Sequence, residues 1–152
     1  HLVSSMFTSA AYLVSGTKRE PLHHVPEISR RGRGIEVWAA LRSLGKKGLA
    51  SLIESNCDSA SLFANKLSSA GYLVLNDVVL NQVLGSFGDS ETTKRVIQRV
   101  QEDGTCWCGG TEWQGNTAMR ISVSSWRTTE NDVEESSNAI IKIANEENKK
   151  SG

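Results

Sequence analysis

The feature that most constrains the fold is a short segment of strict alternation. At positions 119–124 the sequence reads Met-Arg-Ile-Ser-Val-Ser, so apolar and polar side chains alternate residue by residue. Successive side chains of a β-strand point to opposite faces of a sheet. The segment is therefore predicted to be a strand with one buried face and one face open to solvent or to a ligand. A sheet of this kind needs helices to cover its apolar face.

The rest of the chain supplies both helices and further strands. Apolar residues recur at helical spacing from Leu49 to Leu67, and the pattern stops at Gly71. Other expected elements are strands at 72–75, 78–87 and 105–107, a helix ending at Gly104, and a last helix that begins at an approximate capping box of Thr129 and Asp132. The order from residue 46 is helix, strand, strand, helix, strand, strand, helix. This order predicts an α+β fold, a small antiparallel sheet covered by helices.

The first 45 residues have a different character. They read as a helix at 2–14, a polar connector at 17–29 that holds both prolines, and a helix with a buried stripe of Ile35, Trp38, Leu41 and Leu44. Two helices around a long connector do not offer enough apolar surface to fold alone. We predict two domains, 1–45 and 46–145, followed by a charged and frayed tail at 146–152.

Composition excludes several classes of function. Seventeen basic and seventeen acidic residues cancel, so no overall field attracts nucleic acid or an anionic membrane. No apolar run approaches the roughly 20 residues that span a bilayer, and no signal peptide is visible at the start. We expect a cytoplasmic protein. Since the sequence begins with His1, we also expect it to start within a longer gene product.

The three cysteines favour reduced thiols over a disulfide framework or a metal centre. Cys106 and Cys108 are separated by a single residue, whereas zinc sites space such a pair by two to four residues and need a second pair of ligands. Cys57 falls on the apolar stripe of the helix that contains it, which predicts a core position. We therefore predict no metal site.

Arginines are the candidate binding residues. Arg30, Arg31 and Arg33 precede a helix, where cations oppose the helix dipole. Their position is explained equally well by a bound phosphate or carboxylate and by a structural ion pair. Arg120 lies on the polar face of the alternating strand between small residues, as expected for a ligand-facing surface. A structural role for Arg120 remains the alternative.

Other polar groups are weaker candidates. His23 and His24 titrate near neutrality, but no carboxylate stands at a set spacing from them. Trp107, Trp113 and Trp126 are interpreted as packing or interface residues. The sequence contains no defensible Ser-His-Asp arrangement and no pair of catalytic carboxylates.

The arginine cluster begins a long stretch of resemblance to a known family. Residues 29–45, with Arg30-Arg31-Gly32-Arg33 and Trp38, resemble the Arg-Arg-x-Arg-x-x-x-x-Trp segment of group II pyridoxal-phosphate-dependent amino-acid decarboxylases. The likeness extends to Ala144 and includes 10–13, 48–49, 81–83 and 103–126. Gly32 stands where the animal enzymes of this family have an aromatic residue, so the local geometry there differs.

The resemblance implies a fold-type-I enzyme that works as a homodimer with pyridoxal 5'-phosphate and an amino-acid substrate. Residues 1–45 would be the helical end of the large cofactor domain, and 46–145 the small C-terminal domain. The Schiff-base lysine, in a His-Lys pair, would lie upstream of this chain, because the sequence has no such pair. The chain itself is thus expected to hold no cofactor covalently and to contain no catalytic residue. Arg31 and Arg33 would lie near the active site, and Arg120 would hold the substrate carboxylate.

Three functions are compatible with these features. The first is the C-terminal part of a decarboxylase, which positions a carboxylate and contributes dimer surface but needs the missing N-terminal part and a partner subunit. The second is a self-sufficient ferredoxin-like module that binds a small anion at Arg120. The third is a non-decarboxylating lyase or aldehyde synthase of the same cofactor family.

Overall fold

The computed structural model describes residues 32–151, and the chain divides into two compact units, 1–43 and 44–152. Helix α2 (Gly34–Ser69) begins in the first unit and continues into the second. Within it, Gly45 has φ 61° and ψ −175°, which is not helical, so α2 consists of two helical segments joined at this glycine. Positive φ costs glycine little, in accordance with the predicted end of a first helix at this position.

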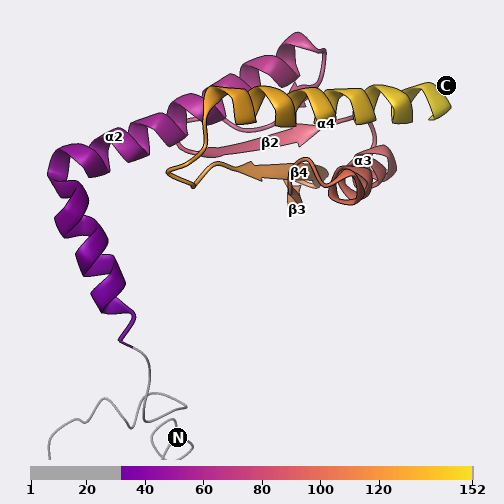
Figure 1. Ribbon diagram of the computed structural model, residues 1–152. Helices are drawn as coiled ribbons and strands as arrows, with labels where there is room; N and C mark the ends of the chain where they lie inside the picture. Colours follow the sequence, from indigo (N-terminus) through magenta and orange to yellow (C-terminus); the bar gives the residue numbers. More distant parts are fainter. Residues whose placement is uncertain (1–31, 152) are drawn as a thin grey trace, which may run out of the picture. The chain divides into compact units, whose positions relative to one another are not determined.

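The second unit holds a four-stranded antiparallel sheet (Figure 1). Its strands are β1 (Leu73–Val74), β2 (Gln82–Ser86), β3 (Gly109–Trp113) and β4 (Asn116–Ser122), arranged in the order β1-β2-β4-β3. Helix α3 (Ser90–Asp103) connects β2 to β3, and α4 (Glu130–Ser151) follows β4. The α+β arrangement and the predicted order of elements are confirmed.

The hydrophobic core lies between one face of the sheet and the three helices. Val83 on β2 pairs with Ile121 on β4, and both are buried. Helices α2, α3 and α4 contribute the remaining core residues, which include Ala60, Phe63, Leu67, Val96, Ile97, Val100, Val133, Ile140, Ile143 and Ala144. The strict alternation at 119–124 thus places Met119, Ile121 and Val123 in the core, as predicted.

Helix α3 has well-formed ends. The Asp89 carboxylate accepts a hydrogen bond from the Thr92 amide at 2.7 Å and caps the N-terminus. At the other end Gly104 adopts φ 78°, and its amide donates to the Val100 carbonyl. The helix therefore ends at the glycine that the sequence singled out.

We expect Gly104→Ala to lower the free energy of unfolding by roughly 1 to 2 kcal/mol, because an L side chain is strained at this φ. Nothing lies within 4 Å of a Cβ added there, so strain of the backbone is the whole cost. Urea denaturation followed by circular dichroism measures the change. Gly109→Ala is the matched control, since its Cβ also meets nothing and its φ is not positive. If the two variants were equally stable, the strained backbone at Gly104 would be contradicted.

Two expected boundaries are wrong. The strand predicted at 105–107 begins instead at Gly109, whose backbone pairs with Arg120. The tail expected to fray from residue 146 continues α4 as far as Ser151.

Thr129 and Asp132 do cap this helix: the Asp132 carboxylate accepts from the Thr129 amide at 2.8 Å, and the Asp132 amide donates to the Thr129 hydroxyl at 3.3 Å.

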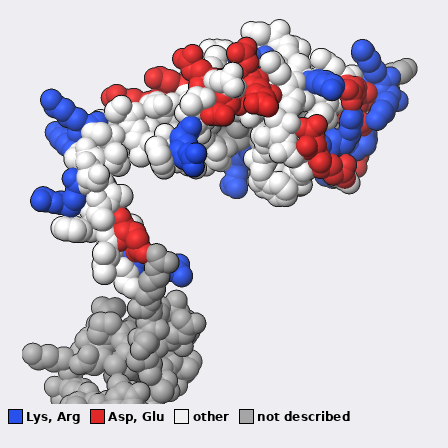
Figure 2. All heavy atoms as spheres, viewed as in Figure 1, with Lys and Arg blue, Asp and Glu red and all other residues white. Residues whose placement is uncertain are grey.

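An ion-pair cluster joins the C-terminal end of α4 to α3. Glu147, 5% exposed, accepts from Arg95 Nε at 3.1 Å, Arg99 Nη1 at 2.9 Å and Lys150 Nζ at 2.8 Å. Arg99 also contacts Glu146 at 2.6 Å. Basic and acidic side chains intermingle at this end of the molecule (Figure 2). Charged residues of the tail that was predicted to fray therefore hold the last turns of the helix in place.

The predicted apolar stripe of the first helical segment is exposed in the structure. Ile35, Trp38 and Leu41 have 70%, 63% and 47% of their surface accessible. In the second segment Cys57 is half-buried instead of fully in the core. Among the described residues, none of the helices has the length and apolar character needed to cross a membrane.

Candidate functional site

The face of the sheet that points away from the helices is the first candidate. We call it the open face. By the strand register it carries Leu73, Gln82, Leu84, Ser86, Gly109, Thr111, Trp113, Ala118, Arg120 and Ser122. Most of these side chains are apolar or small, and Arg120 is the one charged residue among them.

Arg120 lies at the centre of the open face. It is opposite Leu84 on β2 and opposite Gly109 on β3, so its immediate neighbours are an apolar side chain and a residue without a side chain. A Cβ added to Gly109 would meet no atom within 4 Å, which shows that the space beside Arg120 is open. The predicted exposure of Arg120 on the polar face of its strand is confirmed.

The charge of Arg120 is not neutralised within residues 32–151, where its guanidinium has no ion-pair or hydrogen-bond partner. A guanidinium can form two parallel hydrogen bonds with a carboxylate or phosphate. An arginine beside a buried leucine and an open glycine position is thus suited to receive a small anion that has an apolar part. A role in binding stays a prediction.

The remaining predicted site residues lie in the other unit. Arg33 is exposed in the turn that precedes α2, where the Ile35 amide donates to the Gly32 carbonyl at 3.0 Å. Glu36 occupies the first turn of the helix and suits its dipole. Arg31, together with His23 and His24, lies outside the described residues. Arg33 and Arg120 belong to separate units, so each stands as an independent prediction.

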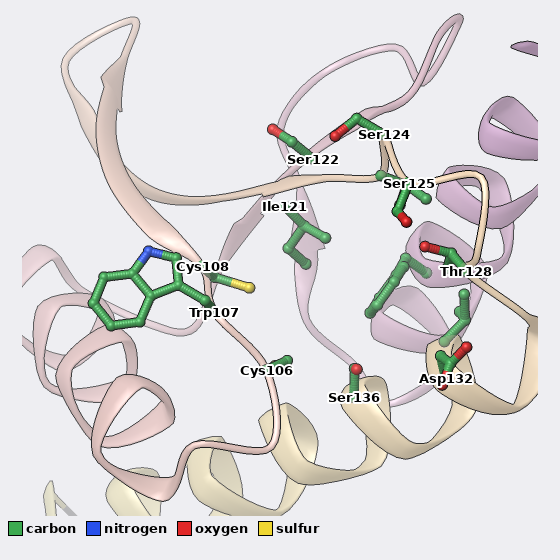
Figure 3. A pocket seen from close by; sticks show the side chains of 13 residues that line it. Cys106, Trp107, Cys108, Ile121, Ser122, Ser124, Ser125, Thr128, Asp132 and Ser136 are labelled. Atoms are coloured by element: carbon green, nitrogen blue, oxygen red, sulfur yellow. The ribbon is translucent and has the colours of Figure 1, made fainter. Parts of the chain in front are cut away.

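A second candidate is a cavity of about 220 Å³ between the end of β4, the loop after α3 and the first turns of α4. Figure 3 shows side chains from these three parts of the chain around it. Its lining includes Cys106, Cys108, Ser122, Ser124, Asp132 and Ser136. The Trp107 indole extends away from these groups and is 76% exposed.

The two thiols in this cavity are not equivalent. Cys106 is half-buried and Cys108 is 4% exposed. A hydrogen bond from the Cys108 thiol, with a second from the Ser136 hydroxyl, lowers the pKa of Cys106 against the opposing effect of burial. The same contact and burial raise the pKa of Cys108. Sequence reasoning missed this site, because it treated the Cys-x-Cys spacing only as a metal motif and could not place Ser136 beside it.

The other sequence candidates add no site. Trp113 and Trp126 are exposed, like Trp107, so none of the three packs in the core. Within residues 32–151 no group of three or more His, Cys, Asp or Glu side chains is arranged to hold a metal ion.

Comparison with known proteins relates the chain to one family. No family model matches. Histidine decarboxylase of Drosophila melanogaster is 30% identical over 121 residues, which are 78% of this chain and 14% of that protein. Histidine decarboxylase of Rattus norvegicus is 26% identical over 136 residues, which are 86% of this chain and 20% of that protein. The chain therefore spans a fifth or less of the length of these relatives.

A solved structure shares the fold. The crystal structure of Oryza sativa TDC with PLP and tryptamine superimposes with a TM-score of 0.76, covers 95% of this chain and 33% of its own, and is 19% identical. The chain thus has the fold of a segment of that protein. The chain belongs to the group II pyridoxal-phosphate-dependent decarboxylase family.

Proposed function

We propose that the chain is the substrate-positioning C-terminal part of a pyridoxal-phosphate-dependent amino-acid decarboxylase. Similarity to histidine decarboxylases over most of its length carries the proposal. Arg120 then binds the carboxylate of the amino acid at the open face. Arg31 and Arg33 are separate candidates, proposed from the family resemblance as residues near the active site of the assembled enzyme. The chain does not catalyse alone.

The roles divide between the cofactor and the protein. Pyridoxal phosphate, when bound in such an enzyme, withdraws the electrons released as the substrate loses its carboxylate. The resemblance to the family implies that the covalent link is made by a lysine in a His-Lys pair, and this sequence contains no such pair. The part left to Arg120 is to hold and orient an anion by paired hydrogen bonds. It transfers no proton.

Surface features support a role within a larger assembly. The first segment of α2 exposes Ile35, Trp38 and Leu41, which recur on one side of the helix at a spacing of three residues. Apolar residues at this spacing favour contact with another protein surface. The N-terminal part of the same enzyme and a second subunit of a homodimer are the proposed partners.

The test uses the extended protein. Reading the source transcript upstream of His1 should reveal a His-Lys pair, and the protein expressed from it should release carbon dioxide from an amino acid. The 152-residue chain alone should show no visible absorbance band with pyridoxal phosphate. Turnover by the isolated chain, or an extended frame without the His-Lys pair, would contradict the proposal.

In the extended enzyme, Arg120→Ala should lower kcat/KM roughly 10- to 100-fold, because a hydrogen bond to a charged group contributes about 1.5 to 3 kcal/mol. Steady-state kinetics measures it. Arg120→Lys should recover part of the loss, since lysine keeps the charge without the planar fork. Arg127→Ala removes an exposed arginine that lies 5.9 Å from the Trp126 ring, and should leave kcat/KM unchanged. Equal losses at 120 and 127 would exclude carboxylate binding by Arg120.

A self-sufficient anion-binding module is the second candidate. The compact unit with its own core favours it, as does Arg120, which has no ion-pair partner among residues 32–151. In this case the isolated chain should bind acetate or a similar carboxylate by calorimetry, and Arg120→Ala should abolish the binding. An aldehyde synthase of the same family would share the fold, because fold does not fix the reaction. Analysis of the products of the extended enzyme distinguishes it from a decarboxylase.

A further inference from the structure

The loop that carries the two cavity thiols is held at both ends. Gly104 ends α3 immediately before it, and the Thr105 amide and hydroxyl both donate to the Asp103 carboxylate, at 3.3 Å and 2.6 Å. After the loop, Gln101 Nε2 donates to the Cys108 carbonyl at 2.7 Å, and Gly109 begins β3. The positions of Cys106 and Cys108 are therefore fixed by the fold.

Both thiols reach the cavity, and they interact with each other. The cavity opens to solvent, and Figure 3 shows the Cys108 sulfur directed into it. Cys106 and Cys108 line this cavity together, two residues apart in the sequence, and the interaction between the two thiols lowers the pKa of Cys106 and raises that of Cys108. Cys106 is the more accessible of the two thiols, because it is half-buried whereas Cys108 is 4% exposed.

The two thiols differ in pKa, and this difference distinguishes a metal-binding pair from a redox-active pair. A soft metal ion would need both groups as thiolates. The interaction with Cys106 and, to a lesser degree, burial raise the pKa of Cys108 and favour its protonated form. In the described part of the chain, the two thiols belong to no group of three or more His, Cys, Asp or Glu side chains that could hold a metal ion. By contrast, redox-active cysteines combine one accessible, stabilised thiolate with an adjacent resolving thiol. The arrangement at 106 and 108 has this form.

We propose that Cys106 and Cys108 form a peroxide-reactive thiol pair, in which Cys106 is the attacking residue and Cys108 the resolving one. This inference does not rest on the proposed decarboxylase function. Its reactant is hydrogen peroxide or a small hydroperoxide, which the cavity can admit.

The reaction balances in two steps. The Cys106 thiolate attacks one oxygen of hydrogen peroxide, the O–O bond breaks, and the departing hydroxide takes a proton and leaves as water. Cys106 is then a sulfenic acid, whose sulfur the Cys108 sulfur attacks. The S–O bond breaks, hydroxide leaves as a second water with the proton of Cys108, and an S–S bond forms. Two thiols are oxidised by two electrons, and one peroxide is reduced to two waters.

The test treats the 152-residue chain with an equimolar amount of hydrogen peroxide and maps it with trypsin. Both cysteines fall in one tryptic peptide, Val100–Arg120, because no lysine or arginine lies between its ends. An internal disulfide makes this peptide about 2 Da lighter and blocks its alkylation, and dithiothreitol reverses both changes. Cys57, the remaining cysteine, should stay open to alkylation, and Cys57→Ser should leave the result unchanged.

A variant tests the order of the two steps. In Cys108→Ser the resolving thiol is absent, so Cys106 should accumulate as a sulfenic acid that dimedone traps, about tenfold faster than Cys57 reacts. Circular dichroism checks the fold, and Cys108→Ala replaces the serine variant if that one unfolds. Trapping of Cys106 no faster than Cys57 would overturn the proposal. So would a disulfide that joins two chains or involves Cys57.

Discussion

Phe87→Ala should lower the free energy of unfolding by about 3 to 5 kcal/mol, the usual cost of deleting a buried aromatic ring. Phe87 is 1% exposed at the end of β2, and its ring centre lies 5.0 Å from that of Tyr72. Its ring also lies 3.3 Å from a Cβ built on Gly85, so that glycine leaves the space that the ring fills. The Phe87 amide donates to the Thr93 hydroxyl, and the Asn148 side-chain amide donates to the Phe87 carbonyl. These bonds hold the surrounding elements in place, so they cannot easily collapse into the void.

Urea denaturation of the wild type and the variant measures the difference. Phe87→Leu should cost less, because it leaves a smaller cavity, and it supplies a value if the alanine variant fails to fold. Trp126→Ala is the matched control: it removes an aromatic ring that is 79% exposed and should change stability little. A loss below about 1 kcal/mol for Phe87→Ala would show that Phe87 does not belong to the core.

Acid should destabilise the protein through Glu147. Hydrogen bonds from Lys150, Arg99 and Arg95 lower the pKa of Glu147 from 4.5 to about 2, with the bond from Lys150 as the largest cause and burial opposing it. A depressed carboxyl pKa contributes stability above the unfolded value, and this stability is lost as the pH falls from about 4.5 towards about 2. The melting temperature should therefore be steady near neutrality and fall steeply in that window.

Comparison with Glu147→Gln isolates this contribution, because Glu146, Asp89, Asp103 and Asp132 also have lowered pKa values and titrate in the same acid range. At pH 7 the variant should melt several degrees lower, since Arg95, Arg99 and Lys150 then lose their shared carboxylate. Its melting temperature should also depend less on pH than that of the wild type. Glu130→Gln changes an exposed carboxylate and serves as the control. If the melting temperatures of wild type and Glu147→Gln fell in parallel with pH, Glu147 would not be the source of the acid sensitivity.

The sequence pattern predicted those parts of the fold that depend on residues close together in the sequence. The alternation at 119–124 identified β4 and both of its faces, and it placed Arg120 on the open one. Gly104 and the Thr129–Asp132 pair marked helix ends, because capping depends on residues close in sequence. The same reasoning failed where distant residues decide. Glu147 orders the end of α4 through arginines of α3, about fifty positions away.

The candidate sites show the same division. Arg120 was found because its strand has a clear period. The thiol site was not, since Ser136 and Cys106 meet only after α4 packs beside the loop. β3 was misplaced because Cys106 and Trp107 favour a strand, whereas Gly109 and Gly110, which do pair with β4, have little strand propensity. The apolar stripe at 35–44 was detected correctly as a pattern, although the described residues do not bury it.

The lengths of the two edge strands determine how readily the sheet can pair with a strand of another molecule. A free sheet edge presents unpaired amides and carbonyls that can recruit a strand from another molecule and start aggregation. Here β4 is paired on both sides, with β2 and with β3. The edge strands are β1, which has two residues, and β3, which has five residues and begins with two glycines. Short, glycine-containing edges give an incoming strand little template. The sheet therefore keeps its longest strand, β4, away from intermolecular pairing.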